Sequence, residues 1–323
     1  MGQEQWCGCR RTRRGIFLAL LGLLYSSLGA TAAPPAGQSS PPQGHAMGSA
    51  PCAWAEPLRG TDNALDVAAT IRALQDNHFN CMAQVIENSP PNTFADFKRL
   101  VSAAQPAGIS VWPVLIPPSE GASSLPYRTD YVGWMKEMAK LSLQYSALRG
   151  VNIDDLFSGI STKTFTRAYL NQIYQAKQEI NPHLLFVPTI YDLDQDVADR
   201  LAGCVDGVWF WWVNLEHNAG LRTLLEDSRV IVANRFPIYS GVYAHQTSWH
   251  QAGRPAPKVL RGALGIGCRY ADGAIIWNLP LLPNTPDNPW LATAREFAPG
   301  GSADLAGKCG LGSTNPPTKP GGE

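Results

Sequence analysis

This chain of 323 residues lacks an excess of either charge. It has 26 basic and 26 acidic residues, so its formal net charge at pH 7 is zero. Proteins that bind nucleic acids or anionic membrane surfaces usually carry a marked basic surplus. We therefore expect no nucleic acid partner and no attraction to a membrane surface.

The sequence also lacks the common motifs of metal-dependent and nucleophilic hydrolases. None of its six histidines stands in an H-x-H or H-E-x-x-H pattern. An amidohydrolase-type barrel would carry H-x-H on its first strand, where residues 53–56 read Ala-Trp-Ala-Glu. There is no G-x-S-x-G elbow of a serine hydrolase. We predict no metal and no cofactor.

The first 32 residues have the pattern of an export signal. Four arginines within residues 10–14 precede an apolar run over 16–24, and small residues lead up to Ala32. The run is short for a bilayer span, although an uncleaved anchor is the alternative. The Arg13-Arg14 pair also resembles a twin-arginine signal. We expect cleavage after Ala32 and a secreted or periplasmic protein without membrane contact after signal removal.

The rest of the chain divides by composition. Residues 33–50 are rich in Pro, Gly, Ser and Gln and predict a disordered linker, while 304–323 predict a flexible C-terminal tail. Residues 51–303 remain between them, and roughly 250 residues is the usual length of one eightfold α/β barrel. We expect one such domain and a monomer.

Strand and helix patterns alternate along this domain. The strands are continuous apolar runs, as in parallel sheets that are buried on both faces. The pattern predicts an α/β fold, a single-domain (β/α)8 TIM barrel. The alternative is an open doubly wound sheet, whose Gly-rich phosphate loop after the first strand is missing. The expected strands cover 52–55, 81–86, 109–116, 150–155, 184–190, 205–213, 236–243 and 273–277, and the expected helices cover 65–76, 93–104, 131–147, 163–180, 196–201, 221–226, 257–266 and 289–297.

The fourth strand ends at two adjacent carboxylates, Asp154 and Asp155. Consecutive side chains of a strand point to opposite sides, so one of the pair can face a cavity. In a barrel of parallel strands, catalytic groups sit at these strand ends. The alternative role is a helix N-cap, but Ser161 and Thr162 are better cap candidates and leave both aspartates free. We predict that this strand is catalytic and that Asp155 is the ionised partner.

Acids and aromatic residues also follow the other strands. Aromatic faces bind sugar rings, and a paired acid and base is what glycosidic cleavage needs. Asp192 could equally cap the helix near residue 196, and Glu216 could be a solvated loop residue. We predict catalytic roles for Asp154, Asp155, Asp192 and Glu216, with Asp192 as the acid across the groove. The predicted substrate-binding residues are Glu56, Glu87, Trp112, Tyr191, Trp212, Asn214, Tyr243, His245, Trp277 and Asn278.

Three segments resemble the barrel glycoside hydrolases. They are Gly150–Asp155 on the fourth strand, Trp212–Asn214 at the end of the aromatic sixth strand and Ile275–Trp277 on the eighth. The chitinase-like family 18 is nearest in layout, although the position of its catalytic acid falls on Phe157 here. The resemblance implies an Asp-bearing fourth strand that faces an aromatic-lined groove for a polysaccharide or oligosaccharide.

These observations favour a secreted, glycoside-hydrolase-like barrel that cleaves a polysaccharide or glycoconjugate by carboxylate acid/base catalysis. A barrel that only binds carbohydrate is one alternative. A metal-dependent deacetylase or phosphodiesterase is another, and it would place a divalent metal at Asp154, Asp155 and Asp192.

Five cysteines remain after signal removal, and an oxidising compartment favours disulfides between them. Cys52 and Cys81 each open one of two successive strands, so we predict a bridge between them. Cys268 with Cys309 is a second candidate pair. Because five is odd, at least one thiol is left over.

Overall fold

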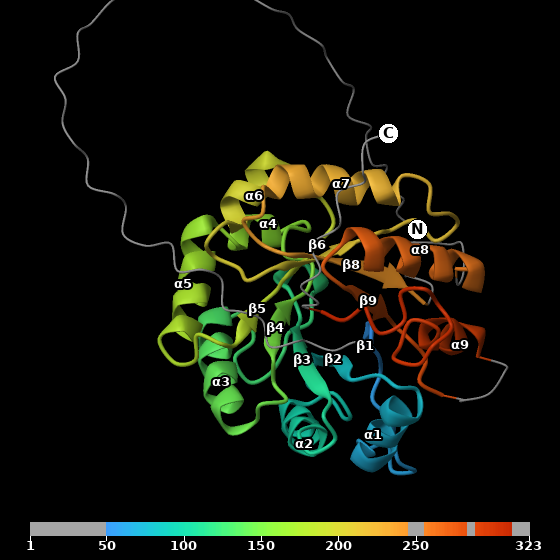
Figure 1. Cartoon of the computed structure of the whole chain (residues 1–323). Coiled ribbons are helices and arrows are strands. Elements are labelled where there is room, and N and C mark those ends of the chain that lie inside the picture. Colours follow the sequence, from blue (N-terminus) through green and yellow to red (C-terminus); the bar gives the residue numbers. More distant parts are fainter. Residues whose placement is uncertain (1–49, 245–254, 283–287, 312–323) are drawn as a thin grey trace, which may run out of the picture. The chain divides into compact units, whose positions relative to one another are not determined.

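A computed structural model describes residues 50–244, 255–282 and 288–311 (Figure 1). His245, the export signal and nearly all of the predicted linker lie outside the described residues. Among those described, no helix combines the length and the apolar character that a membrane crossing requires.

All strand pairs in the described sheet are parallel. β1 pairs with β2 on one side and with β9 on the other, with Trp54 opposite Ala83 and Trp277. The described strands are β1 (Cys52–Trp54), β2 (Cys81–Ile86), β3 (Ser110–Leu115), β4 (Gly150–Ile153), β5 (Leu185–Phe186), β6 (Thr189–Ile190), β7 (Val208–Trp211), β8 (Ile238–Tyr243) and β9 (Ala274–Trp277).

β5 and β6 are two halves of the single strand predicted over 184–190. Pro188 separates them, and proline has no N–H with which to continue the ladder. Hydrogen bonds nevertheless cross the break on both sides: Val187 N donates to Val151 O at 3.0 Å, and Trp209 N donates to Pro188 O at 2.9 Å. Because β5 pairs with β4 and β6 pairs with β7, the sheet closes on itself. The predicted (β/α)8 TIM barrel is confirmed.

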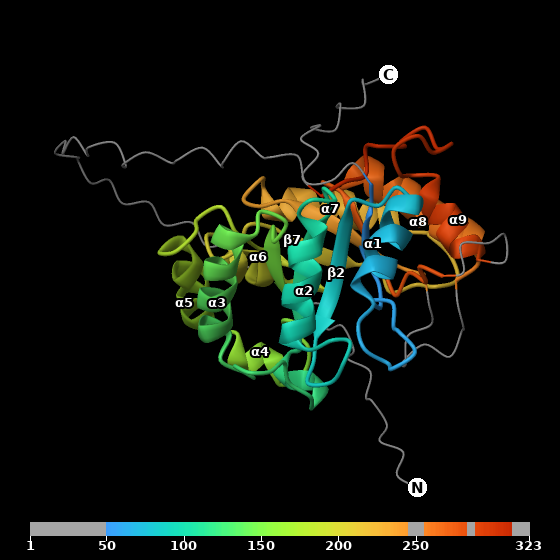
Figure 2. The same cartoon turned by 90° about the horizontal axis from the view of Figure 1, so that it is seen from below.

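Helices surround the outside of the sheet in both views (Figures 1 and 2). Most begin at a side-chain cap, such as Thr93, whose Oγ1 accepts from Asp96 N at 3.1 Å. The described helices are α1 (Val67–Asp76), α2 (Phe94–Ala104), the short 3₁₀ helix η1 (Pro118–Glu120), α3 (Tyr131–Gln144), α4 (Ser161–Thr164), α5 (Arg167–Gln178), α6 (Gln195–Leu201), α7 (Leu221–Val232), α8 (Pro257–Tyr270) and α9 (Pro289–Arg295).

The helix predicted over 163–180 is two helices. Thr166 has extended backbone angles and caps α5, with its Oγ1 accepting from Tyr169 N at 3.3 Å. Ser161 and Thr162, the expected caps, do not act as caps: α4 begins after Ile160 without a side-chain cap, and Thr162 Oγ1 donates to Phe157 O at 2.6 Å. The Thr166 cap therefore starts a new helix within the predicted one.

The barrel interior is filled by indole and phenol rings, which need small residues on neighbouring strands. A Cβ at Gly150 would collide with the ring of Trp112, and one at Gly241 would collide with the ring of Trp211. These two glycines of β4 and β8 thus make room for tryptophans of β3 and β7. The packing fixes the direction in which Trp211 points, toward the C-terminal mouth of the barrel.

Both predicted disulfides are present. Cys52 bonds to Cys81 with the Cα atoms 4.6 Å apart, and Cys268 bonds to Cys309 with the Cα atoms 4.8 Å apart. Cys204 is the free cysteine of the described residues and is buried. The second bridge ties down part of the segment predicted as a flexible tail.

Residues 304–311 pack on the barrel. Cys309 and Leu311 are fully buried, and Ala274 N donates to Cys309 O at 3.0 Å. The packed domain therefore extends to residue 311, past the predicted boundary at 303.

Candidate active site

A cavity of about 510 Å³ opens at the C-terminal ends of the strands. Every strand but the short β5 contributes a residue at its end or in the loop that follows, as expected for a barrel of this type. The lining residues are Trp54, Ala55, Glu56, Val85, Glu87, Asn92, Val114, Ile116, Glu120, Ala122, Asp154, Asp155, Tyr191, Trp211, Tyr243, Trp277 and Asn278.

Eight of the predicted site residues therefore meet in one cavity. They are Glu56, Glu87, Asp154, Asp155, Tyr191, Tyr243, Trp277 and Asn278. Parallel strands point their C-terminal ends the same way, so residues up to about 220 positions apart in the sequence converge there.

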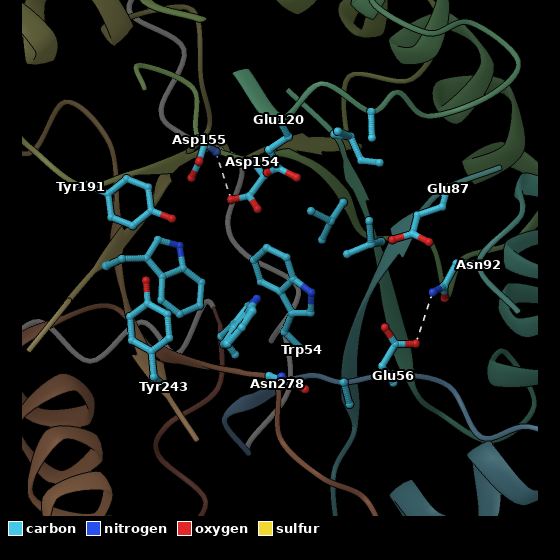
Figure 3. A pocket seen from close by; sticks show the side chains of 17 residues that line it. Trp54, Glu56, Glu87, Asn92, Glu120, Asp154, Asp155, Tyr191, Tyr243 and Asn278 are labelled. Carbon is cyan, nitrogen blue, oxygen red and sulfur yellow. Dashed lines mark hydrogen bonds between the residues drawn. The ribbon is translucent and has the colours of Figure 1, made fainter. Parts of the chain in front are cut away.

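Three carboxyl groups form one side of the cavity: Glu120, Asp154 and Asp155 (Figure 3). Asp154 Oδ1 accepts from the backbone N of Asp155 at 3.0 Å, which fixes its orientation. The Asp155 backbone has φ of 42°, in the left-handed region that a non-glycine residue rarely adopts. Both carboxyl groups line the same cavity although they are consecutive in the chain.

The two aspartates differ in electrostatic surroundings. Burial, then the charges of Asp155 and Glu120, raises the pKa of Asp154 well above its ordinary value. Burial also raises the pKa of Asp155, and a hydrogen bond from the Tyr191 hydroxyl offsets only part of that rise. Asp155 is therefore the carboxyl group that ionises first, while Asp154 retains its proton to higher pH.

Glu120 is a site residue that the sequence analysis missed. It ends η1, two residues after the proline pair that closes the third strand. The residue as a whole is exposed, but its carboxyl group points toward Asp154 (Figure 3). Burial, followed by the charges of Asp155 and Glu87, raises the pKa of Glu120 from 4.5 to about 7. A sequence signal existed, because Glu120 is an acid in a loop that follows a barrel strand.

Two further acids, Glu56 and Glu87, lie on the opposite side of the cavity (Figure 3). Asn92 Nδ2 donates to Glu56 Oε2 at 3.2 Å. Burial, and next the charge of Glu56, raises the pKa of the half-buried Glu87. The cavity therefore has two separate acidic sides, at the ends of β1 and β2 and at the ends of β3 and β4.

Aromatic rings form a continuous third side. Trp54 contacts Trp211 with ring centroids 5.6 Å apart, Trp211 contacts Tyr243 at 5.2 Å, and Tyr243 contacts Trp277 at 5.5 Å. Tyr191 stands beside them and links the wall to Asp155. Trp54 and Trp211 were not among the predicted binding residues.

Strand alternation separates Trp211 from Trp212. Trp211 faces the cavity, whereas Trp212 points outward and donates from Nε1 to His217 O at 3.3 Å. Trp112 does point inward but is fully buried below the mouth, where its ring packs on Trp209 with centroids 5.7 Å apart. Neither Trp112 nor Trp212 lines the cavity.

The other predicted residues lie in loops outside the cavity. Asp192 and Glu216 are exposed, and neither belongs to the lining. Asn214 Oδ1 accepts from the backbone N atoms of Glu216 and His217 at 2.9 and 3.0 Å, so it stabilises a turn. Asp194 rather than Asp192 caps α6, accepting from Val197 N at 2.9 Å.

The metal alternative required Asp192 to join Asp154 and Asp155, which it does not. Over residues 50–244, 255–282 and 288–311, no group of three or more His, Cys, Asp or Glu side chains has the arrangement of a metal site.

No protein-family model matches the chain, and no curated protein matches its sequence. Solved structures do share its fold. An endo-1,4-beta-mannanase from Rhizomucor miehei has a TM-score of 0.56 at 10% identity, covering 80% of this chain and 96% of its own. A GH113 beta-1,4-mannanase has a TM-score of 0.53 at 9% identity, and the match covers 77% of this chain and 98% of the mannanase. A GH27 beta-L-arabinopyranosidase from Geobacillus stearothermophilus has a TM-score of 0.51 at 9% identity, and the match covers 76% of this chain and 75% of that enzyme.

These similarities establish the fold. The chain folds as a (β/α)8 barrel, the fold that these glycoside hydrolases also have. At such low sequence identity, the likeness establishes the fold and leaves the chemistry to be argued from the cavity.

Proposed function

We propose that this protein is an exported glycoside hydrolase that cleaves a polysaccharide or glycoconjugate. The observation that carries the proposal is the meeting of Glu120, Asp154 and Asp155 opposite an aromatic wall at the mouth of the barrel. Glycosidic cleavage needs one protonated and one ionised carboxyl group in the same cavity. The surroundings of these side chains favour one protonated and one ionised carboxyl group.

Glu120 acts as the general acid in this proposal. Its pKa of about 7 keeps its proton through mildly acidic and neutral pH, so it can protonate the oxygen that leaves as the glycosidic bond breaks. An ordinary glutamate would already be ionised there. Glu120 thus takes the role that the sequence analysis gave to Asp192.

Asp155 is the ionised carboxylate. It either attacks the anomeric carbon directly or takes a proton from the water that does so. Asp154 keeps its proton and, through the bond from Asp155 N, positions its neighbour. Tyr191 donates to Asp155 and stabilises its charge.

The aromatic wall binds the sugar rings. Trp54, Trp211 and Trp277 line the cavity with indole rings, whose exposed parts can contact the C–H side of a pyranose ring. Asn278 and Asn92 add polar groups suited to hydroxyls.

The test is release of new reducing ends from a panel of purified polysaccharides, followed by mass spectrometry of the products. The parent should cleave one class of glycan. Asp155→Asn and Glu120→Gln should each lower turnover by several orders of magnitude, whereas Glu179→Gln, at the exposed residue that follows α5, should not. If the parent cleaves a substrate and both cavity variants cleave it at the same rate, the assignment of Asp155 and Glu120 is wrong.

A barrel that binds carbohydrate without cleaving it is the second candidate. Phe157 stands where family 18 has its catalytic acid, and its ring lies 5.0 Å from the guanidinium carbon of Arg200. Tight glycan binding by the parent without any product from the panel would favour this candidate.

Export is part of the proposal. The two disulfides are consistent with an oxidising compartment. N-terminal sequencing of the protein recovered from the culture medium or periplasm should begin at Ala33. Recovery of the uncleaved chain in the membrane fraction would support the anchor instead.

A further inference from the structure

The cavity is lined by acids, whereas the chain as a whole is neutral. Among the described residues, its lining includes five carboxyl groups and no lysine, arginine or histidine. A concave site lined by one sign of charge concentrates ligands of the opposite sign. The five acids are Glu56, Glu87, Glu120, Asp154 and Asp155.

The cleavage chemistry accounts for only part of this charge. Glu120, Asp154 and Asp155 are sufficient for acid/base cleavage, whereas Glu56 and Glu87 stand on the other side of the cavity. Glu56 lies 3.7 Å from Arg59, but both side chains are largely exposed and such a pair contributes little. Among the described residues, Glu87 has no ion-pair partner within 4 Å.

A second observation concerns Asp155. Its Oδ1 atom is buried and has no hydrogen-bond partner among the described residues. A buried acceptor without a donor is costly, and a donor on a ligand in the cavity would remove that cost. The unused acceptor thus indicates that a hydrogen-bond donor occupies this side of the cavity when it is filled.

The aromatic wall connects the two acidic sides. Trp54 lies between Asp154 on one side and Glu56 on the other (Figure 3). An indole face attracts both the C–H face of a sugar and a cation placed over the ring. An occupant with sugar rings, hydrogen-bond donors and positive charge matches all three features.

We propose that the cavity selects glycans that carry free, protonated amino groups, that is, chains of unacetylated hexosamine units. Glu56 and Glu87 bind the ammonium group of one unit while a neighbouring unit lies at the cleavage position beside Asp155. Uronic acids and sulfated sugars are excluded by the same charge. The inference rests on the proposed function for the position of the scissile bond, but the binding preference is measurable without turnover.

The experiment compares two oligosaccharides of equal length, one of glucosamine and one of N-acetylglucosamine, by isothermal titration calorimetry at about pH 6, where primary amines are charged. All proteins carry Glu120→Gln to prevent turnover. Because the pKa of Glu120 is about 7, that carboxyl is already mostly protonated at about pH 6, and the change leaves the cavity charge nearly unaltered. An oligogalacturonate of the same length serves as the anionic probe.

The glucosamine oligosaccharide should bind about tenfold or more tightly than its N-acetylated counterpart, and the ratio should shrink at about 0.5 M salt. Glu56→Gln/Glu87→Gln should bring the ratio near one. The matched control Glu179→Gln/Asp227→Asn removes two exposed charges, one just after α5 and one in α7, and should keep the ratio. Glu56→Gln alone should lower the affinity ratio by a smaller amount. Because Glu56 is exposed, this single variant replaces the double variant if the latter does not fold.

Equal affinity for the two oligosaccharides, tighter binding of the oligogalacturonate, or an unchanged ratio in the Glu56/Glu87 variants would overturn the inference. The proposed function fails separately. If the parent cleaves neutral glycans without preferring amino glycans, the inference is wrong and the hydrolase stands. If it binds amino glycans tightly but releases no product from them or from any other glycan, the inference holds and the hydrolase proposal is wrong.

Discussion

Replacing Glu120 by glutamine tests the acid/base assignment most directly. The change keeps the shape of the side chain and removes the proton that Glu120 would give to the leaving oxygen. A positioned general acid usually contributes about 10²–10⁴-fold to the rate, so kcat should fall by that factor. Binding of the glycan should change little, because the aromatic wall is untouched.

The pH dependence gives the prediction its magnitude. With a pKa of about 7, Glu120 is about 90% protonated at pH 6 and about 9% at pH 8. Activity of the parent should therefore fall about tenfold between these two pH values. An ordinary glutamate of pKa 4.5 would be only about 3% protonated at pH 6, and the decline would already be steep below that pH.

The assay is kcat/KM for release of reducing ends between about pH 4 and pH 9. The pH profile of Glu120→Gln should lack the alkaline limb, that is, the decline in kcat/KM at high pH. Glu87→Gln removes a charge that raises the pKa of Glu120, so its alkaline limb should move to lower pH, while Glu179→Gln should leave it in place. An alkaline limb at an unchanged pH in Glu120→Gln would show that another group supplies the proton.

Other predictions follow from the same cavity and from the first disulfide. Asp155→Asn should abolish turnover but raise the melting temperature at neutral pH, because it removes a charge that is partly buried beside other acids. Tyr191→Phe removes the donor that lowers the pKa of Asp155, so the acid limb of the rate profile should move to higher pH. The fold raises the pKa values of Asp154 and its neighbours, so the native state binds extra protons between their ordinary pKa values and about pH 7. Thermal melts should therefore show stability falling as pH rises through that window, with a smaller slope in Asp154→Asn. Replacing Cys52 and Cys81 by serine should lower the free energy of unfolding in denaturant titrations by roughly 3–4 kcal/mol, since the bridge closes a loop over a separation of 29 residues.

The fold could be predicted from the sequence because its signals are local and repeated. Each apolar run that is followed by an amphipathic segment specifies one strand and one helix, and the parallel direction of the strands then fixes which ends meet. Asp154 and Trp277 needed no further information to be placed at one mouth. The errors in the fold were at Pro188 and Thr166, where one residue interrupts an element whose overall pattern continues.

The site was predictable only in part, because loop conformation decides which side chains turn inward. Trp211 and Trp212 are adjacent and chemically alike, and a shift of one residue in strand register would exchange them. Asp192 and Glu216 have the right chemistry and the right place in the chain, yet their loops turn them into solvent. Glu120 is reached through a proline-rich loop and a 3₁₀ turn, which period and composition do not resolve.

The acids of the cavity shift one another's pKa values. Asp155 raises the pKa of Glu120 and keeps it protonated, so the group proposed to hold a negative charge also prepares the group proposed to donate a proton. Glu87 acts on Glu120 in the same direction from across the cavity. A cationic sugar bound at Glu56 and Glu87 would offset part of that field and lower the pKa of Glu120, which makes it a stronger acid while the substrate is in place. The rate profile of the parent on an amino glycan should therefore have its alkaline limb at lower pH than the profile on a neutral glycan. Alkaline limbs at the same pH on the two substrates would show that the charge of the ligand does not change the pKa of Glu120.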